Sequence, residues 1–229
     1  MAGQGGVPNG ALSPADKWDG IIPPECQSNS AILRLNPYNM KWEEAHEPLH
    51  GNGIGPGMPF ANSLLKRDPS IGVIGLVPTA YPGSYIDSWS RVGKHYINML
   101  AMARAAVADG GVLRGFLWYQ GESDSKLQSD VDLYKGKLVD LFNNVRADLQ
   151  SPSLPIIEVA LASGFNFTES IRQIQLHIEV PNVKVVDAAG LEILPPNCLE
   201  HNDQRHCLHI STAAQVKLGT MLADAFLQC

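Results

Sequence analysis

The sequence is short of cysteine and of long hydrophobic runs, and each shortage narrows the range of possible functions. Its four cysteines are widely spaced and form no Cys-x-x-Cys pair, so they supply neither a redox motif nor a paired-thiolate zinc template. No stretch of about 18 uninterrupted apolar residues is present, and a helix needs such a stretch to span a bilayer. The sequence therefore predicts no membrane-spanning segment.

Positive charge is also scarce. Charged residues make up 17% of the chain, and the acidic excess gives a net charge of -6. Binding of nucleic acid depends on clustered Lys and Arg, and no such stripe is present, so a neutral or small substrate is favoured over nucleic acid. Residues 1–20 lack the charged and apolar regions of a signal peptide, and neither localisation nor oligomeric state follows from the composition.

What the sequence does contain fits one α/β domain over residues 1–229, with 45% hydrophobic residues for a core. The first 70 residues are rich in Gly, Pro and Asn and predict loops with little regular structure. From Ile71 onward, short apolar runs alternate with helical patterns. The predicted strands are Ile71–Val77, Val112–Tyr119, Ile156–Leu161 and Val183–Val186. The predicted helices are Tyr96–Asp109, a helix with the apolar stripe Val131, Tyr134, Leu138, Leu141, Phe142, Val145 and Leu149, Glu169–Glu179, and a final helix from Thr212 with Ser211 as its N-cap.

Strands that are apolar on both faces and alternate with helices predict a parallel sheet covered on both sides. Function in such sheets lies at the carboxyl ends of the strands. The segments that follow those ends are Thr79–Trp89, Gln120–Asp124 and Asp187–His209. The site is therefore expected where these three segments converge.

Each segment carries a group suited to catalysis. Gly83, in the first, lets a backbone N–H approach a ligand without a Cβ in the way. Gln120, in the second, has a side-chain amide that can donate a hydrogen bond, and His209, just before the last helix, can serve as a general base.

These segments resemble the SGNH hydrolases of carbohydrate esterase family six, plant-type relatives of sialate O-acetylesterases. The opening Met1-Ala2-Gly3-Gln4-Gly5-Gly6 looks like the tail of the family block Gly-Gln-Ser-Asn-Met-Ala-Gly-x-Gly. Four later blocks match in order along the chain: Ile54 to Ala61, the Gly83 segment, Trp118-Tyr119-Gln120-Gly121-Glu122-Ser123-Asp124 and the His209 segment. The resemblance implies a three-layer αβα, flavodoxin-like fold and an esterase that deacetylates carbohydrate without a cofactor.

The resemblance also implies the roles of several residues. In the family a serine attacks, a histidine shuttles the proton and an oxyanion hole stabilises the tetrahedral intermediate. His209 would be the base, Gly83 and Gln120 the oxyanion donors, and Glu122 a brace between the loops. The serine and the first strand of the family fold would lie upstream of Met1, so the chain as given is expected to lack its nucleophile. Their absence would leave an open hydrophobic slot in the middle of the sheet.

Two positions have less direct assignments. Ser28 lies in a second Gln-Ser-Asn triplet, but the strand and glycine turn that a nucleophile needs are missing around it, so the match is interpreted as coincidence. The family places its triad acid three residues before the histidine, where this chain has His206. Asp203 is the favoured replacement, and Asp187 is the alternative.

Two other functions compete with the esterase. His201, His206, Cys207 and His209 have metal-binding side chains, but their spacing matches no zinc template, so no metal is expected. A non-catalytic carbohydrate-binding protein with the same fold is the second candidate, because the serine is missing and His206 replaces the expected acid.

Overall fold

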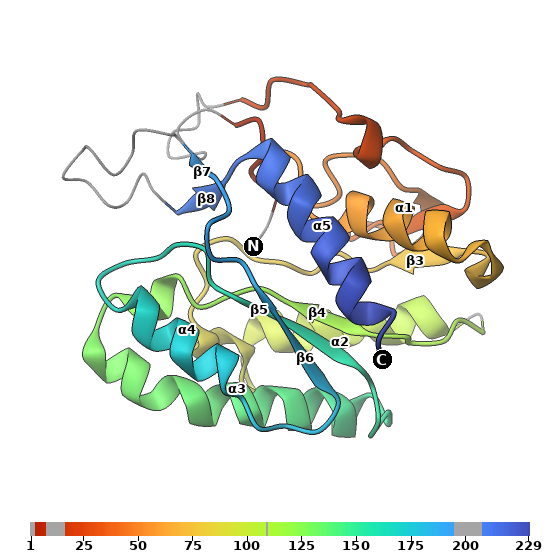
Figure 1. The fold of residues 1–229 in the computed structure, drawn as a ribbon. Helices are drawn as coiled ribbons and strands as arrows, with labels where there is room; N and C mark the ends of the chain where they lie inside the picture. The colour runs from red at the N-terminus through yellow and green to blue at the C-terminus, as the bar shows by residue number, and fades with distance from the viewer. Residues whose placement is uncertain (1–2, 8–16, 109, 195–207) are drawn as a thin grey trace.

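The computed structural model describes residues 3–7, 17–108, 110–194 and 208–229. Its strands form two half-sheets and a short hairpin (Figure 1). The first half-sheet contains β1 (Ile32–Leu35), β2 (Trp42–Glu44) and β3 (Ile74–Leu76) in the order β2-β1-β3, with β1 antiparallel to β2 and parallel to β3. The second contains β4 (Phe116–Trp118), β5 (Ile156–Ala160) and β6 (Val183–Asp187) in sequence order, all parallel. The hairpin pairs β7 (Ile193–Leu194) with β8 (His209–Ile210).

Helices cover both faces of these strands and bury two large apolar clusters, besides a small third one of Leu35, Met102 and Ala106. The first cluster joins α1 (Gly57–Arg67) and α5 (Thr212–Phe226) to one face, through residues such as Ile157 and Val159 of β5. The second joins α2 (Lys94–Val107), α3 (Gln128–Asp148) and α4 (Thr168–Leu176) to the opposite face, through residues such as Ile156. Short 3₁₀ turns occur at Pro24–Cys26, Pro69–Ile71, Ile86–Trp89 and Ser123–Ser125. The predicted αβα layering with parallel strands is confirmed.

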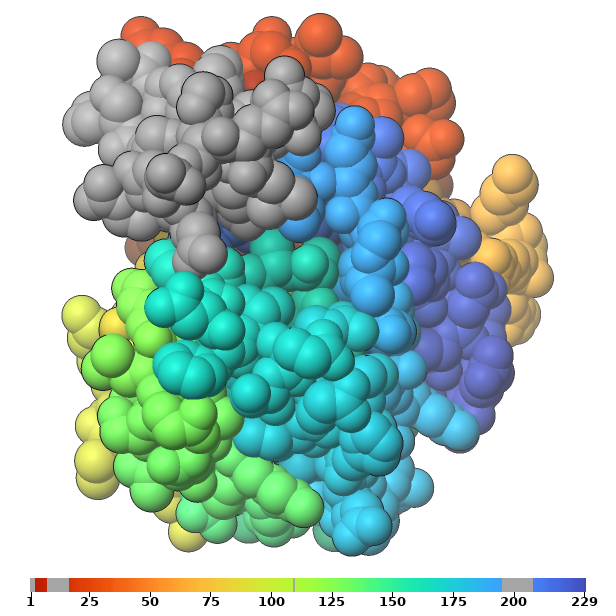
Figure 2. Space-filling model, turned by 60° about the vertical axis from the view of Figure 1, so that its left-hand side comes forward, coloured from red at the N-terminus to blue at the C-terminus, as the bar shows by residue number. Residues whose placement is uncertain are grey.

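The strands and helices predicted beyond residue 70 are all present, but the predicted strands Ile71–Val77 and Val112–Tyr119 shorten to the three residues of β3 and of β4. The predicted stripe on α3 is buried from Val131 to Val145, and only its last member, Leu149, is partly exposed. The predicted N-cap is also confirmed, because the Ser211 side chain accepts a hydrogen bond from the backbone N–H of Ala214 at 3.2 Å. In Figure 2 the side chains of α3, α4 and the neighbouring β6 form one continuous outer surface. None of the helices in the described parts of the chain is long and apolar enough to cross a membrane.

The expectation of loops with little regular structure before residue 70 is wrong for the part that forms β1, β2 and α1. Helix α1 was not predicted because Pro56, Gly57 and Pro59 lie at its start, and these residue types usually indicate turns. Proline is tolerated in the first turn of a helix because the backbone N–H groups there have no intrahelical acceptor. The helix is stabilised instead by tertiary contact, since its apolar face packs directly against α5.

Candidate active site

The two half-sheets are separated by a cavity. Strands β3 and β4 are edge strands of their respective half-sheets, and no backbone hydrogen bond joins them within the described residues. Between them lies a cavity of about 960 Å³, lined by every residue of both strands. The open slot expected in the middle of the sheet is therefore present.

The three segments predicted to carry the site line this same cavity. Gly83, Gln120 and His209 all contribute to its wall, and Glu122 lies beside Gln120. The loops that follow β3 and β4 are joined by hydrogen bonds from the Gln120 amide to the Ser84 carbonyl and from the Ser123 hydroxyl to the Gly83 carbonyl, so they meet beside the cavity. Each of the three segments thus contributes residues to the wall of this cavity, and their chemistry depends on the contacts that each residue makes.

His209 lies in the short strand β8, where it pairs with Leu194 of β7. The preceding residue is also fixed, because the Ser163 hydroxyl donates a hydrogen bond to the Leu208 carbonyl at 2.9 Å. Burial lowers the pKa of the imidazole to about 4, so the ring is neutral at pH 7 and able to accept a proton. Its buried Nδ1 has no hydrogen-bond partner among the described residues, which leaves that nitrogen available to an acid.

The structure separates the two candidates for that acid. Asp187 is engaged elsewhere: its carboxylate accepts from Arg172 on α4 at 2.8 and 3.2 Å and from the backbone N–H of Ala189 at 2.8 Å. The hydrogen bonds from Arg172 hold the Asp187 pKa below its ordinary value. Asp203 and His206 lie outside the described residues. Asp187 is thus committed to another partner, and Asp203 stays a prediction.

Gly83 has the backbone expected of a glycine-dependent turn. Its φ is +66°, a left-handed conformation that glycine adopts at little cost. Its carbonyl accepts a hydrogen bond from the Ser123 hydroxyl at 3.0 Å, which ties this turn to the loop after β4. Its N–H has no acceptor within residues 3–7, 17–108, 110–194 and 208–229, so the group is available to a ligand in the cavity.

Gln120 is held more tightly than the sequence suggests. Its amide nitrogen donates to the Ser84 carbonyl at 2.9 Å and to the Asp124 carboxylate at 2.6 Å. An amide nitrogen has two protons, and both are used by these contacts. In this arrangement Gln120 joins the loops after β3 and β4, and it must release one contact before its side chain can donate to an oxyanion.

Glu122 lines the cavity, and burial raises the pKa of its carboxyl group. It forms no ion pair with Arg114 or Lys126 in the described chain, so surface pairing does not account for its position. Its backbone carbonyl accepts from the Ser125 hydroxyl at 2.8 Å, a contact that stabilises the turn following β4.

No serine hydroxyl in the described cavity wall beside these loops is free to act as a nucleophile. The Ser84 and Ser123 hydroxyls donate to the carbonyls of Tyr81 and Gly83 at 3.0 Å. Ser28 does not line the cavity, and its hydroxyl donates to the Ala45 carbonyl at 2.8 Å. These contacts give all three hydroxyls structural partners.

The zinc alternative cannot be assembled from the described residues, which contain no group of three His, Cys, Asp or Glu side chains placed to hold a metal ion. His201, His206 and Cys207 lie outside these residues.

Two carboxylates near the site were missed in the sequence. Buried Asp124 accepts from the Ile86 N–H at 3.1 and 3.2 Å as well as from Gln120, and burial raises its pKa to about 6. Buried Glu47 also lines the cavity. The sequence offered one signal for such carboxylates, which is an acidic residue such as Glu47 within a segment otherwise rich in Gly and Pro.

Comparison with known proteins gives consistent similarities. Residues 1–228 match the family described as carbohydrate esterase, sialic acid-specific acetylesterase. The chain is 43% identical over 235 residues to an Arabidopsis thaliana protein named "Probable carbohydrate esterase", covering 99% of this chain and 86% of that protein. It is also similar to an X-ray structure of an Arabidopsis thaliana protein, at 43% identity and a TM-score of 0.89 over 100% of this chain and 93% of that one. A carbohydrate acetylesterase from Xanthomonas citri shares the fold at 17% identity, with a TM-score of 0.59 over 88% of this chain and 50% of that one.

Proposed function

The chain belongs to the carbohydrate esterase family described as sialic acid-specific acetylesterase, and on this basis we propose that it forms most of a carboxylic ester hydrolase that deacetylates carbohydrate. The observation that carries the proposal is the convergence of His209, Gly83 and Gln120 on one cavity. A neutral imidazole with an unpaired Nδ1 is suited to a general base whose other nitrogen is oriented by an acid.

The proposed reaction is acyl transfer to a serine and then to water. His209 takes the serine proton as the hydroxyl oxygen attacks the ester carbonyl, and returns it to the departing sugar oxygen. The Gly83 N–H stabilises the oxyanion, with the Gln120 amide as a second donor once it releases Ser84 or Asp124. Glu122 braces the loop that carries Gln120. Water then attacks the acyl-enzyme carbonyl while His209 takes its proton; the bond from the acyl carbon to the serine oxygen breaks as His209 returns that proton to the serine, which releases acetic acid.

The serine is proposed to lie just upstream of Met1, on a strand that fills the slot between β3 and β4. A parallel strand there would pair with both open edges and join the half-sheets into one sheet. A strand of three residues, about 10 Å long, would be enough to match β3 and β4. Its carboxyl end would deliver the serine to the same edge of the sheet as Gly83 and Gln120.

A non-catalytic carbohydrate-binding protein is the second candidate. It is favoured by the hydrogen bonds that occupy the Ser84 and Ser123 hydroxyls and both protons of the Gln120 amide. A protein of this kind would use the cavity wall to hold a sugar, without ester turnover.

Hydrolysis of p-nitrophenyl acetate separates the two candidates. The comparison uses the chain as given and a longer polypeptide, the extended protein, which adds an apolar strand and Gly-Gln-Ser-Asn before Met1. We expect turnover only in the extended protein, because it alone supplies the nucleophile. A matched extended protein with alanine at the added serine should be inactive. Folded but inactive extended protein that still binds acetylated sugar would favour the binding candidate.

Asp203 is proposed as the triad acid, and the pH dependence of kcat/KM tests it. A carboxylate at Nδ1 favours the imidazolium and so raises the His209 pKa, whereas without it burial, as the largest cause, lowers this pKa to about 4. The base acts in its neutral form, so activity is lost as pH falls through this pKa. Asp203→Asn in the extended protein is therefore expected to move the acid limb toward pH 4. Asp187→Asn is the matched control, and a shift with Asp187→Asn alone would identify Asp187 as the acid.

A further inference from the structure

Glu47 is a buried carboxylate at the base of the loop formed by residues 49–55. Its side chain is 5% exposed and lines the cavity wall. One carboxylate oxygen accepts from the backbone N–H of Leu49 at 3.0 Å, and the other accepts from the N–H of Gly55 at 3.4 Å. Burial raises its pKa to about 7, with these two N–H groups and the charge of Arg34 acting in the opposite direction. The two hydrogen bonds tie the two ends of the loop to one side chain.

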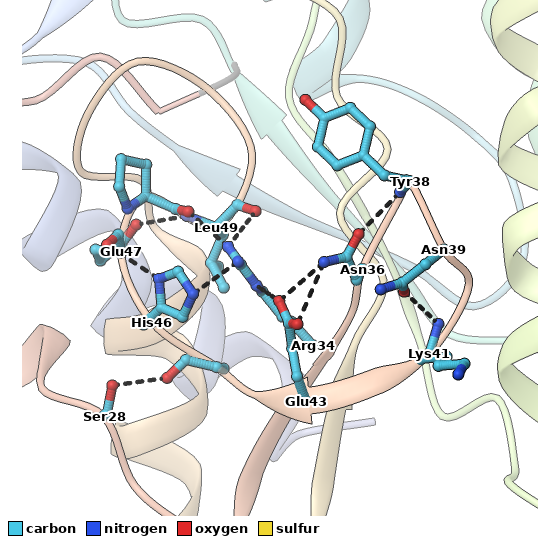
Figure 3. A network of polar contacts seen from close by, with 12 residues as sticks. Ser28, Arg34, Asn36, Tyr38, Asn39, Lys41, Glu43, His46, Glu47 and Leu49 are labelled. Carbon is cyan, nitrogen blue, oxygen red and sulfur yellow. Dashed lines mark hydrogen bonds and ion pairs between the residues drawn. The ribbon is translucent and has the colours of Figure 1, made fainter.

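Arg34 of β1 holds the same loop from the other side, as Figure 3 shows. Its Nη1 donates to the carbonyls of Pro48 and Leu49 at 2.8 and 3.0 Å, and its Nη2 contacts Nε2 of His46 at 2.7 Å. Arginine can only donate, so His46 Nε2 is the acceptor and the ring proton lies on Nδ1. That Nδ1 faces the Glu47 carbonyl at 3.3 Å, so the backbone at both sides of Pro48 is fixed.

The loop in turn fixes the path of Gly3 to Gly5. Gly5 and Ile54 exchange two backbone hydrogen bonds, at 3.0 and 2.9 Å. The Gly3 carbonyl accepts from the N–H groups of Asn52 and Gly53 at 3.2 and 3.1 Å. The approach is so close that a Cβ on Gly3 would lie 2.6 Å from the Gly53 carbonyl oxygen. The backbone of Gly3 to Gly5 is thus set by the backbone of the loop.

We infer that Glu47 is a positioning residue for the reaction: by fixing both ends of the 49–55 loop it fixes Gly3 to Gly5, and so the turn that carries the serine. The inference rests on the proposed function for its catalytic consequence, because the serine is proposed to lie just upstream of Met1. The mechanical part, from Glu47 to Gly3, depends only on contacts within the described chain.

Hydrogen exchange tests the mechanical part in the chain as given. In Glu47→Ala we expect the backbone amides of Gly5 and of residues 52–54 to exchange at least tenfold faster, because the loop loses both of its ties. Amides of β5, Ile156–Ala160, should be unchanged. Glu47→Gln should be intermediate, because an amide oxygen keeps one acceptor while its nitrogen cannot accept. Equal exchange in Glu47→Ala and wild type, or faster exchange across the whole chain, would overturn the inference.

Glu43→Gln is the matched control. Glu43 also binds Arg34, at 2.8 Å, but it lies on the outer side of the network and does not line the cavity. Glu43→Gln should leave the exchange rates of the backbone amides of Gly5 and residues 52–54 within twofold of those of the wild type. An effect as large as that of Glu47→Ala would mean that general support from Arg34, and not Glu47, fixes the loop.

Kinetics of the extended protein test the catalytic consequence. Glu47→Ala is expected to lower kcat for p-nitrophenyl acetate at least tenfold with KM within twofold, and Glu47→Gln should recover part of kcat. A loss confined to KM would overturn the positioning role. An inactive wild-type extended protein would contradict the proposed function, and the exchange result would then still decide whether Glu47 controls Gly3 to Gly5.

Discussion

His209→Ala in the extended protein is expected to lower kcat/KM for p-nitrophenyl acetate by about 10⁴- to 10⁶-fold. The histidine removes the serine proton during attack and returns it to the leaving group, and alanine can do neither. The backbone that carries this histidine is held by pairing with Leu194 and by the Ser163 contact to Leu208. Steady-state kinetics at pH 7 measure the effect, with circular dichroism to verify folding.

His50→Ala is the control for this prediction. His50 also lines the cavity, and burial lowers its pKa, so it offers a second neutral imidazole in the same wall. Its ring lies edge-on to Tyr81, with ring centroids 6.3 Å apart, as part of the aromatic packing beside the loop after β3. We expect His50→Ala to change kcat/KM by less than about tenfold. The assignment would be reversed by a large loss in His50→Ala and a small one in His209→Ala.

Glu158→Gln is expected to stabilise the protein at pH 8. Glu158 lies in β5, is 0% exposed, and its carboxyl oxygens have no hydrogen-bond partner among the described residues. Burial raises its pKa to about 9, whereas an unfolded glutamate titrates near 4. The folded protein therefore binds a proton that the unfolded chain releases. The protonated Glu158 carboxyl group contributes fully to stability below about pH 4. This contribution is lost, at roughly 1.4 kcal/mol per pH unit, as the pH rises to about 9.

Urea unfolding at pH 5 and pH 8 measures this effect. From pH 5 to pH 8, the free energy of unfolding should decrease by a few kcal/mol more in the wild type than in Glu158→Gln. Glu179→Gln, at an exposed position after α4, is the control and should follow the wild type within about 0.5 kcal/mol. Parallel pH dependence in wild type and Glu158→Gln would show that Glu158 is not protonated in the folded state.

Much of the fold could be predicted from the sequence because its signals are local. The stripe on α3 appears as a spacing of three and four residues, and β5 appears as an apolar run. Helix α1 could not be predicted in the same way. Its stability comes from packing against α5, about 150 residues away in sequence, while its own first turn contains Gly57 and Pro59. In α1 the local sequence favours a turn, whereas packing against α5 favours a helix, and the packing determines the structure.

In the candidate site, too, some features could be predicted from the sequence and others could not. The positions of Gly83, Gln120 and His209 follow from where strands end, so the sequence could bring them together. The contacts of Gln120 could not be predicted, because they depend on how the turn at Ser84 lies against Asp124. The role of Glu47 depends likewise on contacts with loop amides, which no spacing in the sequence reveals.

The unpaired edges of β3 and β4 also bear on solubility. Among the residues that the structure describes, neither edge facing the slot has a strand partner, and such an edge is the arrangement on which a strand of another molecule can add. Two such edges face one slot, so a single foreign strand could pair with both at once. A polypeptide whose slot stays empty is therefore prone to concentration-dependent aggregation, and occupation of the slot would protect the protein from self-association as well as complete its fold.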